Sequence, residues 1–145
     1  MQVSLREVTK ENINPVLRLQ VHKKQEQFVA NNAWSIAQGT YSDLSWFRAI
    51  YADDTPVGFV MLELNPAKEE YYVWRLMVDG KHQGKGYGRK ALQLIIEFVR
   101  DKTDAKQLLL SYVPAEGSAV TFYKKLGFVE TGEVEEGENI MKLAL

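Results

Sequence analysis

The glycine-rich segment at residues 83–89, Gln-Gly-Lys-Gly-Tyr-Gly-Arg, constrains the fold of this chain more than any other feature. It follows an apolar, β-prone run at residues 71–78 and opens an amphipathic stretch at residues 86–102. Glycines let backbone N–H groups converge with no Cβ in the way, and a helix N-terminus adds partial positive charge. Residues 79–90 carry four cations and one acid, a net charge of +3. This strand–loop–helix junction therefore predicts a site for a phosphate group.

Two common phosphate-binding motifs do not fit the spacing of these glycines. A P-loop needs glycines five positions apart followed by Lys and Ser or Thr, whereas Gly80 and Gly84 are only four apart. A Rossmann loop needs the pattern G-x-G-x-x-G, but Gly84, Gly86 and Gly88 follow G-x-G-x-G. The chain that follows the loop is also too short for a doubly wound sheet.

The rest of the sequence predicts alternating strands and helices in one mixed α/β domain, residues 1–145. Alternating or continuous apolar runs indicate strands, and apolar residues three or four apart indicate helices. The run at residues 106–113 is apolar enough for burial on both faces of a sheet. Ser118 is expected to cap the last helix and Gly127 to end it. The expected strands are residues 3–8, 46–51, 57–64, 71–78, 106–113, 128–129 and 139–145, and the expected helices are residues 13–24, 33–38, 86–102 and 119–126.

Composition excludes several classes of function. Lys and Arg total 18 against 19 Asp and Glu, a net charge of −1, which argues against a nucleic-acid binder because such proteins carry a basic excess. The chain has no cysteine, so disulfides, thiolate metal sites and a cysteine nucleophile are excluded. No apolar run approaches the ~20 residues that span a bilayer, and the N-terminus lacks the apolar core of a signal peptide. We therefore expect a soluble, cytoplasmic protein with neither a membrane nor a nucleic acid as partner.

Two motifs resemble those of the GNAT superfamily of acetyltransferases. Gln83-x-x-Gly86-x-Gly88 resembles the family's pyrophosphate loop for acetyl-CoA, Q/R-x-x-G-x-G/A. The segment at residues 118–128 resembles the family's A-x-x-x-Y-x-K-x-G-F pattern, whose tyrosine approaches the sulfur of coenzyme A, and it puts Tyr123 in that position. The resemblance covers essentially the whole chain. It implies the GNAT fold, a mixed, mostly antiparallel central sheet of about six to seven strands flanked by about four helices.

The resemblance implies an acetyl-CoA-dependent N-acetyltransferase that needs no metal. The acetyl group would pass directly from the thioester to a primary amine in a ternary complex, without a covalent enzyme intermediate. Tyr123 would act on the leaving thiolate, whose reference pKa is ~8.5, and strand amides near residues 76–78 would stabilise the oxyanion. The residues expected to bind the coenzyme are Leu76, Met77, Val78, Gln83, Gly84, Lys85, Gly86, Tyr87, Gly88, Arg89, Ser118 and Lys125.

Several short segments resemble the bacterial spermine/spermidine acetyltransferases within the superfamily, among them residues 57–61 and 74–79. This narrower resemblance implies a small-molecule amine, a polyamine, as acceptor, and it suggests a homodimer because relatives are often dimers. Residues 127–141 carry five glutamates and no Lys or Arg, a net charge of −5, and such an acidic surface would attract a polycation. Glu63 and Glu70 are the expected amine anchors or proton acceptors, because they lie on or beside the central strands.

Three further residues lie on or near the expected site. Trp74 stands where some polyamine acetyltransferases carry the acid assigned as the base, so the base cannot be carried over. Glu116 stands where many relatives have Asn, and we expect its carboxylate to point away from the coenzyme phosphates. Arg75, on the same buried strand as Trp74, is expected to pair with an acid. Other acceptors stay open, namely a protein N-terminus, a lysine side chain or an aminoglycoside, as does a CoA-binding regulatory module without catalysis.

Overall fold

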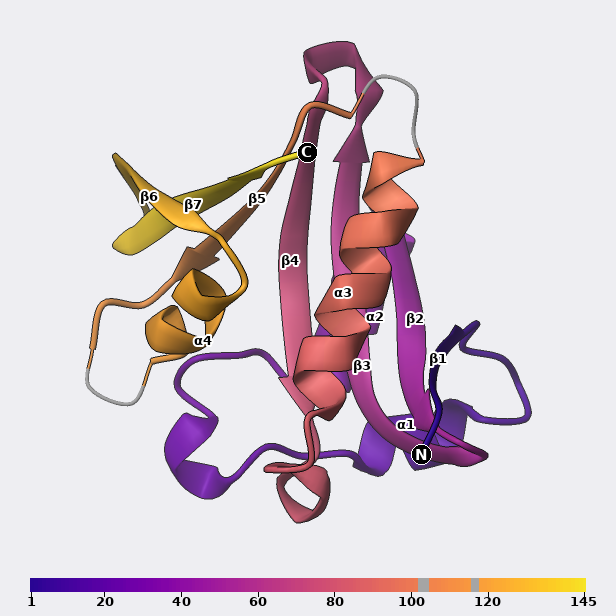
Figure 1. The fold of residues 1–145 in the computed structure, drawn as a ribbon. Coiled ribbons are helices and arrows are strands. Elements are labelled where there is room, and N and C mark those ends of the chain that lie inside the picture. The colour runs from indigo at the N-terminus through magenta and orange to yellow at the C-terminus, as the bar shows by residue number, and fades with distance from the viewer. Residues whose placement is uncertain (102–104, 116–117) are drawn as a thin grey trace.

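A computed structural model describes residues 1–101, 105–115 and 118–145, so Glu116 lies outside the described residues. Its centre is a seven-stranded sheet in the order β1-β2-β3-β4-β5-β7-β6 (Figure 1). Among the described strands only β4 and β5 pair in parallel, and this mixed, mostly antiparallel sheet confirms the predicted fold class. The strands are β1 (Val3–Arg6), β2 (Ser45–Ala52), β3 (Thr55–Asn65), β4 (Glu70–Val78), β5 (Gln107–Tyr112), β6 (Val129–Glu135) and β7 (Glu138–Ala144). The helices are α1 (Ile13–Arg18), α2 (Asn32–Thr40), α3 (Tyr87–Arg100) and α4 (Val120–Lys125), with short 3-10 helices η1 (Lys23–Gln25), η2 (Pro66–Lys68) and η3 (Gly80–His82).

Helices cover both faces of the sheet, with α3 in front of the central strands in Figure 1 and α2 behind them. On the α3 face, Leu92 and Ile95 are fully buried and pack with strand residues such as Leu62. On the opposite face, Val16 of α1 packs with Phe59 of β3. Burying one such apolar side chain stabilises a fold by ~1.5–3 kcal/mol. The central strands are therefore fixed from two sides.

β4 pairs along its whole length with β3 but only in part with β5. The parallel pairing of β4 and β5 joins residues 70–73 to residues 107–110 and then ends. Beyond that point β5 continues beside β7, while β4 runs away from both towards η3 and α3 (Figure 1). We call the space between the diverging strands the β4–β5 split. One edge of residues 74–78 has no neighbouring strand among the described residues, so backbone groups on that edge face the split.

A β-bulge in β4 lies at the start of this split. Met61 opposes Arg75 and Leu62 opposes Val73, so Trp74 is the extra residue on β4. A bulge re-aims side chains, and two consecutive residues can then share one face of the sheet. Trp74 and Arg75 accordingly line the same cleft, on the face that carries α2.

Several predicted boundaries differ from the structure. The helix predicted for residues 13–24 ends at Arg18, because the next residue adopts an extended conformation and η1 forms separately. Ala119, not Ser118, is the N-cap of α4, and its side chain makes no capping hydrogen bond. The strand predicted at residues 128–129 is longer and runs to Glu135. No helix among the described residues has the length and apolar character needed to cross a membrane.

Candidate active site

The glycine loop between β4 and α3 has the geometry expected of an anion site. Gly84 and Gly86 have φ angles of 80° and 82°, in the left-handed region that favours glycine. Gly86 is the N-cap of α3, and no side chain caps this end, so backbone N–H groups of the first turn lack an intrahelical partner. A Cβ added at either glycine would meet no atom within 4 Å. The loop thus leaves room for a phosphate group directly against its backbone.

The side chains of the loop have two different roles. Lys85 and Arg89 are exposed, and they supply positive charge beside the loop. The amide of Gln83 instead donates a hydrogen bond to the carbonyl of Val78 (2.8 Å), and the ring of Tyr87 is buried. Gln83 and Tyr87 therefore use their side chains to position the loop, which leaves their backbone for a ligand.

The loop is also tied to the segment that follows α1. The buried carboxylate of Asp79 accepts a hydrogen bond from the backbone N–H of Gln20 (2.9 Å). The amide of Gln83 donates a second hydrogen bond to Oε1 of Gln25 (2.9 Å). Residues 26–30, which come directly after this contact, line the cleft described below. These hydrogen bonds thus connect the glycine loop, where the coenzyme is expected, to a segment that lines the cleft, where the amine is expected.

Leu76, Met77 and Val78 lie on β4 where it borders the split. The side chains of Leu76 and Val78 pack with the α3 core, and Met77 is buried in the core on the other face. A Cβ added at Gly58 of β3 would lie 2.4 Å from the carbonyl oxygen of Met77. β3 therefore packs closely against the backbone of β4 on the side away from the split.

Tyr123 lies on α4 among aromatic rings. The ring centroids of Phe122 and Phe128 are 5.5 and 6.2 Å from its own. Burial raises the pKa of Tyr123 to about 12, and the nearby phenol of Tyr72 adds to the shift. The hydroxyl of Tyr123 therefore keeps its proton at neutral pH. A Cβ added at Gly88 would lie 3.9 Å from Cζ of Phe122, so α4 sits against the first turn of α3.

Ser118 and Lys125, also expected at the coenzyme, lie just before and at the end of the helix that carries Tyr123. Ser118 is half-buried, and its backbone N–H donates to the carbonyl of Ala115 (3.1 Å) in the connection from β5 to α4. Lys125 is exposed in the last turn of α4. Both lie on the α4 side of the split, and their contacts with the coenzyme stay predictions.

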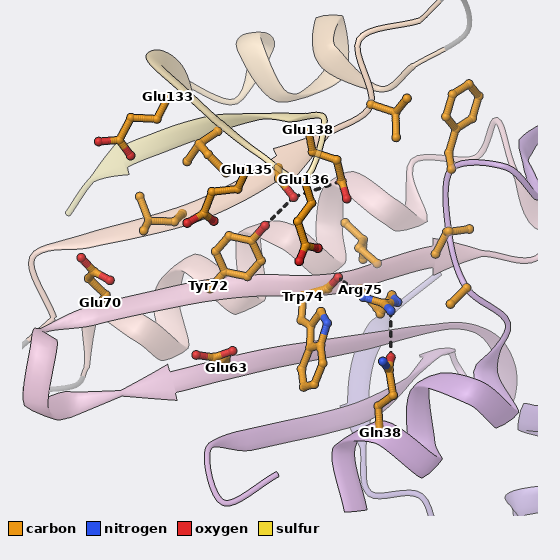
Figure 2. Close-up of a pocket in the computed structure, with 18 of the residues that line it drawn as sticks. Gln38, Glu63, Glu70, Tyr72, Trp74, Arg75, Glu133, Glu135, Glu136 and Glu138 are labelled. Carbon is orange, nitrogen blue, oxygen red and sulfur yellow. Dashed lines mark hydrogen bonds between the residues drawn. The ribbon is translucent and has the colours of Figure 1, made fainter. Parts of the chain in front are cut away.

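A cleft of about 1090 Å³ opens on the face of the sheet opposite α3 (Figure 2). Glu63 and Glu70, the two acids predicted at the amine site, both line it. The structure adds one glutamate from the segment before α2 and four from the β6–β7 hairpin. The charged residues of the lining are Glu26, Glu63, Glu70, Glu133, Glu135, Glu136 and Glu138, with Lys68 and Arg75. Seven acids against two cations give the lining a net charge of −5.

These acids are spread around the cleft. Figure 2 shows the hairpin glutamates on one side of Tyr72, and Glu63 and Glu70 on the other. Within the described ranges, no three His, Asp or Glu side chains form a group that could hold a metal ion. Spaced negative charges of this kind suit an elongated cation with several charges.

β5 forms part of the floor of the cleft. The sequence predicted that both faces of this strand are buried, but only one face is. Leu108 and Leu110 are buried in the α3 core. Leu109 and Ser111 point the other way and are half-buried in the lining of the cleft. The second face of β5 would be buried only if another layer of the protein packed on it. The cleft lies there instead.

Arg75 lies at the β4 bulge on the cleft floor. Its guanidinium donates to Oε1 of Gln38 (2.9 Å) and to the carbonyl of Trp74 (3.1 Å), and it lies 5.6 Å from the centroid of the Trp74 ring. These partners, found among the described residues, are not the acid that the sequence predicted. Burial lowers the pKa of Arg75, whereas the charge of Glu138 opposes that shift.

A hydrogen-bonded chain crosses three strands where the split begins. Tyr72 on β4 donates to Oγ of Ser111 on β5, and Ser111 donates to Oε1 of Glu138 on β7 (3.1 Å; Figure 2). Burial raises the pKa of Tyr72, as do the charges of Glu138 and Glu135, against the opposing effect of the Ser111 hydrogen bond. The sequence did not predict this chain, because it depends on the register of three separate strands. The one available signal was a serine inside the apolar run at residues 106–113.

Known proteins resemble this chain along nearly its whole length. The model of the acetyltransferase (GNAT) family matches residues 13–128. The spermine/spermidine N(1)-acetyltransferase of Bacillus subtilis (strain 168) is 27% identical over 148 residues, which cover 97% of each chain. The spermidine N-acetyltransferase from Vibrio cholerae, solved in complex with CoA and spermine, superposes with a TM-score of 0.79 at 17% identity and covers 99% of this chain and 95% of that chain. The ribosomal-protein-S18-alanine N-acetyltransferase from Escherichia coli gives a TM-score of 0.74 at 16% identity, covering 99% and 94%.

The likeness to the solved structures shows the fold, since the identities are low. The family match covers most of the chain, including the glycine loop and Tyr123. The motifs that carried the resemblance therefore lie inside the matched region. The chain belongs to the GNAT family, and it is an acetyltransferase.

Proposed function

We propose that this acetyltransferase transfers the acetyl group of acetyl-CoA directly to a primary amine of a polyamine such as spermidine or spermine. The observation that carries the proposal is the acidic cleft, whose lining has a net charge of −5 and reaches residues 74–76 at the split. The glycine loop, with its exposed cations, lies at the end of the same strand. Coenzyme and amine would then meet where β4 and β5 separate.

The coenzyme is proposed to bind its diphosphate on the backbone amides of residues 84–88 and to extend along the split. Lys85 and Arg89 would add positive charge there. Backbone N–H groups of residues 76–78 would hold the thioester oxygen, because β5 does not pair with that edge of β4 among the described residues. Rigid backbone donors stabilise a developing oxyanion without reorganisation. The V. cholerae relative was solved with CoA and spermine, which supports this use of the fold.

A polyamine suits the cleft by charge and by shape. Polyamines carry several ammonium groups joined by methylene chains, and seven glutamates are spread over the lining. One pair of opposite charges at ~4 Å gains ~1 kcal/mol in bulk water and ~4 kcal/mol near a protein surface, so several pairs would favour a polycation over a monoamine. Trp74 and Phe28 add apolar surface for the methylene chains. The name of the B. subtilis relative supports the same acceptor.

Tyr123 is proposed to serve the leaving group. Its pKa of about 12 exceeds the reference pKa of a thiol, ~8.5, so its hydroxyl would stabilise the departing thiolate first by a hydrogen bond. No covalent intermediate is needed, and the chain has no cysteine to form one. Direct transfer predicts that both substrates must be bound before either product leaves, so ping-pong kinetics would contradict it.

A panel of amines with acetyl-CoA as donor tests the proposal. The panel contains spermidine, spermine, a monoamine, a lysine peptide, an alanine-starting peptide and an aminoglycoside. We expect kcat/KM to be highest for spermidine or spermine. The double variant E133Q/E135Q should raise the polyamine KM about 10-fold or more, because removing two charges weakens ion pairing. Glu130→Gln, on the same hairpin but outside the cleft lining, is the matched control.

Two outcomes of the panel would contradict the proposal in different ways. Turnover of a peptide or an aminoglycoside without turnover of polyamines would keep the acetyltransferase and replace its acceptor. Stabilisation of the protein by CoA, with no turnover of any amine, would indicate a coenzyme-binding regulatory module.

A further inference from the structure

The cleft contains many carboxylates, but among the described residues only one belongs to a hydrogen-bonded chain of side chains. Of its seven glutamates, Glu138 alone hydrogen-bonds to another side chain in the described part of the molecule. That partner is Ser111, which in turn accepts the hydroxyl of Tyr72. Glu63 and Glu70, the acceptors predicted from sequence, line the cleft without joining this chain.

The chain reaches β4 at the fork of the split. Tyr72 lies opposite Leu109, one position before the last β4–β5 pair, and Ser111 is the first β5 residue beyond that pairing. The phenol of Tyr72 lines the acidic cleft, yet it is close enough to Tyr123 to raise the pKa of that residue. Tyr72 therefore lies in the expected amine site and within electrostatic reach of Tyr123, the residue expected at the leaving group.

We propose that the attacking amine loses its proton to Tyr72, and that the Tyr72–Ser111–Glu138 chain carries the charge of that proton to the Glu138 carboxylate. This inference rests on the proposed function, because an alkylammonium with a reference pKa of ~10.4 must become neutral before it attacks. The N–H bond breaks as an O–H bond forms on Tyr72. The phenol's own proton moves to Ser111, and the serine's own proton moves to Glu138.

The rest of the reaction balances with one proton released. The neutral amine forms the C–N bond to the acetyl carbon, and the C–S bond then breaks. The second proton of the nitrogen ends on the sulfur by way of Tyr123, which gives one proton and takes one. Glu138 passes the first proton to solvent. The products are an amide, a thiol and one free proton.

The surroundings of Tyr72 keep its hydroxyl neutral, as a group that passes protons must be. Burial raises its pKa, and the charges of Glu138 and Glu135 raise it further, while Arg75 acts in the opposite direction. On β3, Glu63 lies opposite Tyr72 in the register of the sheet. The indole of Trp74 has no group that accepts a proton. The Tyr72–Ser111–Glu138 chain would therefore supply the base that an acid at this position supplies in some relatives.

Variants of Tyr72 and Glu138, the two ends of the hydrogen-bonded chain, test the proposal in assays with spermidine and acetyl-CoA. Y72F and E138Q should each lower kcat about 100-fold at about pH 7.5, within the range of general acid–base catalysis. The deficit should shrink towards about pH 10, where more of the amine is neutral in solution. The KM for acetyl-CoA should stay at the wild-type value. E130Q is the matched control, because Glu130 also accepts a tyrosine hydroxyl, that of Tyr112, but outside the cleft lining, and it should keep the wild-type kcat.

Thermal unfolding and CoA calorimetry establish that each variant is folded. S111A is a third variant that interrupts the hydrogen-bonded chain, and it removes only one hydroxyl group. Wild-type kcat and pH profile in Y72F, S111A and E138Q would overturn the proposal. So would a loss confined to the spermidine KM, which would make Glu138 an ion-pair partner. Either result with an active wild-type enzyme overturns the proton path alone. A wild-type protein inactive towards every amine overturns the proposed function and this inference with it.

Discussion

The phenol of Tyr123 shows how burial decides the role of one side chain. Its pKa of about 12 comes first from desolvation and then from Tyr72. A phenol in water would have a pKa of ~10. Because the shift is upward, Tyr123 keeps its proton over the whole range in which an amine substrate becomes neutral, and it can donate a hydrogen bond throughout.

Tyr123→Phe should therefore lower kcat about 100-fold without changing the KM for acetyl-CoA. In the wild-type enzyme, ionisation of Tyr123 should cause no loss of activity below about pH 11. Steady-state rates between about pH 7 and pH 10.5 measure both effects. Tyr112→Phe, which removes a hydroxyl bonded to Glu130, is the control and should leave kcat at the wild-type value. Full turnover in Y123F would exclude Tyr123 from the chemistry.

The same shift has a consequence for stability. A tyrosine whose pKa is higher in the folded state keeps its full contribution below about pH 10, and loses it as the pH rises towards about 12. From about pH 9 to pH 11, the free energy of unfolding should fall by about 1 kcal/mol more in the wild type than in Y123F. Denaturant unfolding at the two pH values measures this difference. An equal fall in both proteins would mean that the phenol is hydrated in the folded state.

Sequence motifs could predict Tyr123 and the glycines as site residues, because each motif lies within one short stretch of chain. The partnership of Tyr72 with Ser111 could not be predicted in the same way. It needs the parallel register of β4 and β5, which sets Tyr72 opposite Leu109 and Ser111 just beyond the pairing. Contacts between strands far apart in the chain depend on that register, and no local pattern specifies it.

The junction of the glycine loop with α3 is the element on which the proposed coenzyme binding depends. Gly86 combines a φ of 82° with open space where a side chain would begin. Gly132 in β6 has the same combination, with a φ of 84°, but it lies far along the chain from the loop. Comparing substitutions at the two glycines therefore distinguishes the effect of backbone strain from the effect of a lost ligand contact.

Gly86→Ala should raise the Kd for CoA about 10-fold or more, because a methyl group would occupy the space beside the loop amides. Both Gly86→Ala and Gly132→Ala should cost about 1–2 kcal/mol of stability, the strain of a non-glycine residue in the left-handed region. Calorimetry with CoA and thermal unfolding measure the two quantities. A wild-type Kd in Gly86→Ala, or equal weakening in both variants, would argue against phosphate binding at this loop.

Elements with strong periodicity were predictable, and the weaker ones were not. The amphipathic pattern of α3 and the apolar runs of β2, β3 and β4 appear at the predicted places. The pattern after Arg18 looked helical because Leu19 and Val21 are apolar, yet both pack from an extended segment. Tertiary packing thus overrode the local spacing.

In the whole molecule, two regions of opposite charge adjoin the same strand, β4. The loop of residues 79–90 carries a net charge of +3, and the lining of the cleft carries −5. The sequence predicted the sign of each region from its charge runs. It could not predict that Glu63 and Glu70 share a cleft with the β6–β7 hairpin, because the sheet order places β7 and β6 beyond β5. This arrangement would keep an anionic coenzyme and a cationic acceptor at different ends of one site.

A crystal structure with CoA and spermine bound together tests the central claim most directly. We expect the diphosphate against the amides of residues 84–88, the sulfur between Tyr72 and Tyr123, and the spermine ammonium groups against the glutamates of the cleft. A glycine loop left empty at saturating CoA, or a coenzyme bound in another part of the molecule, would contradict the account.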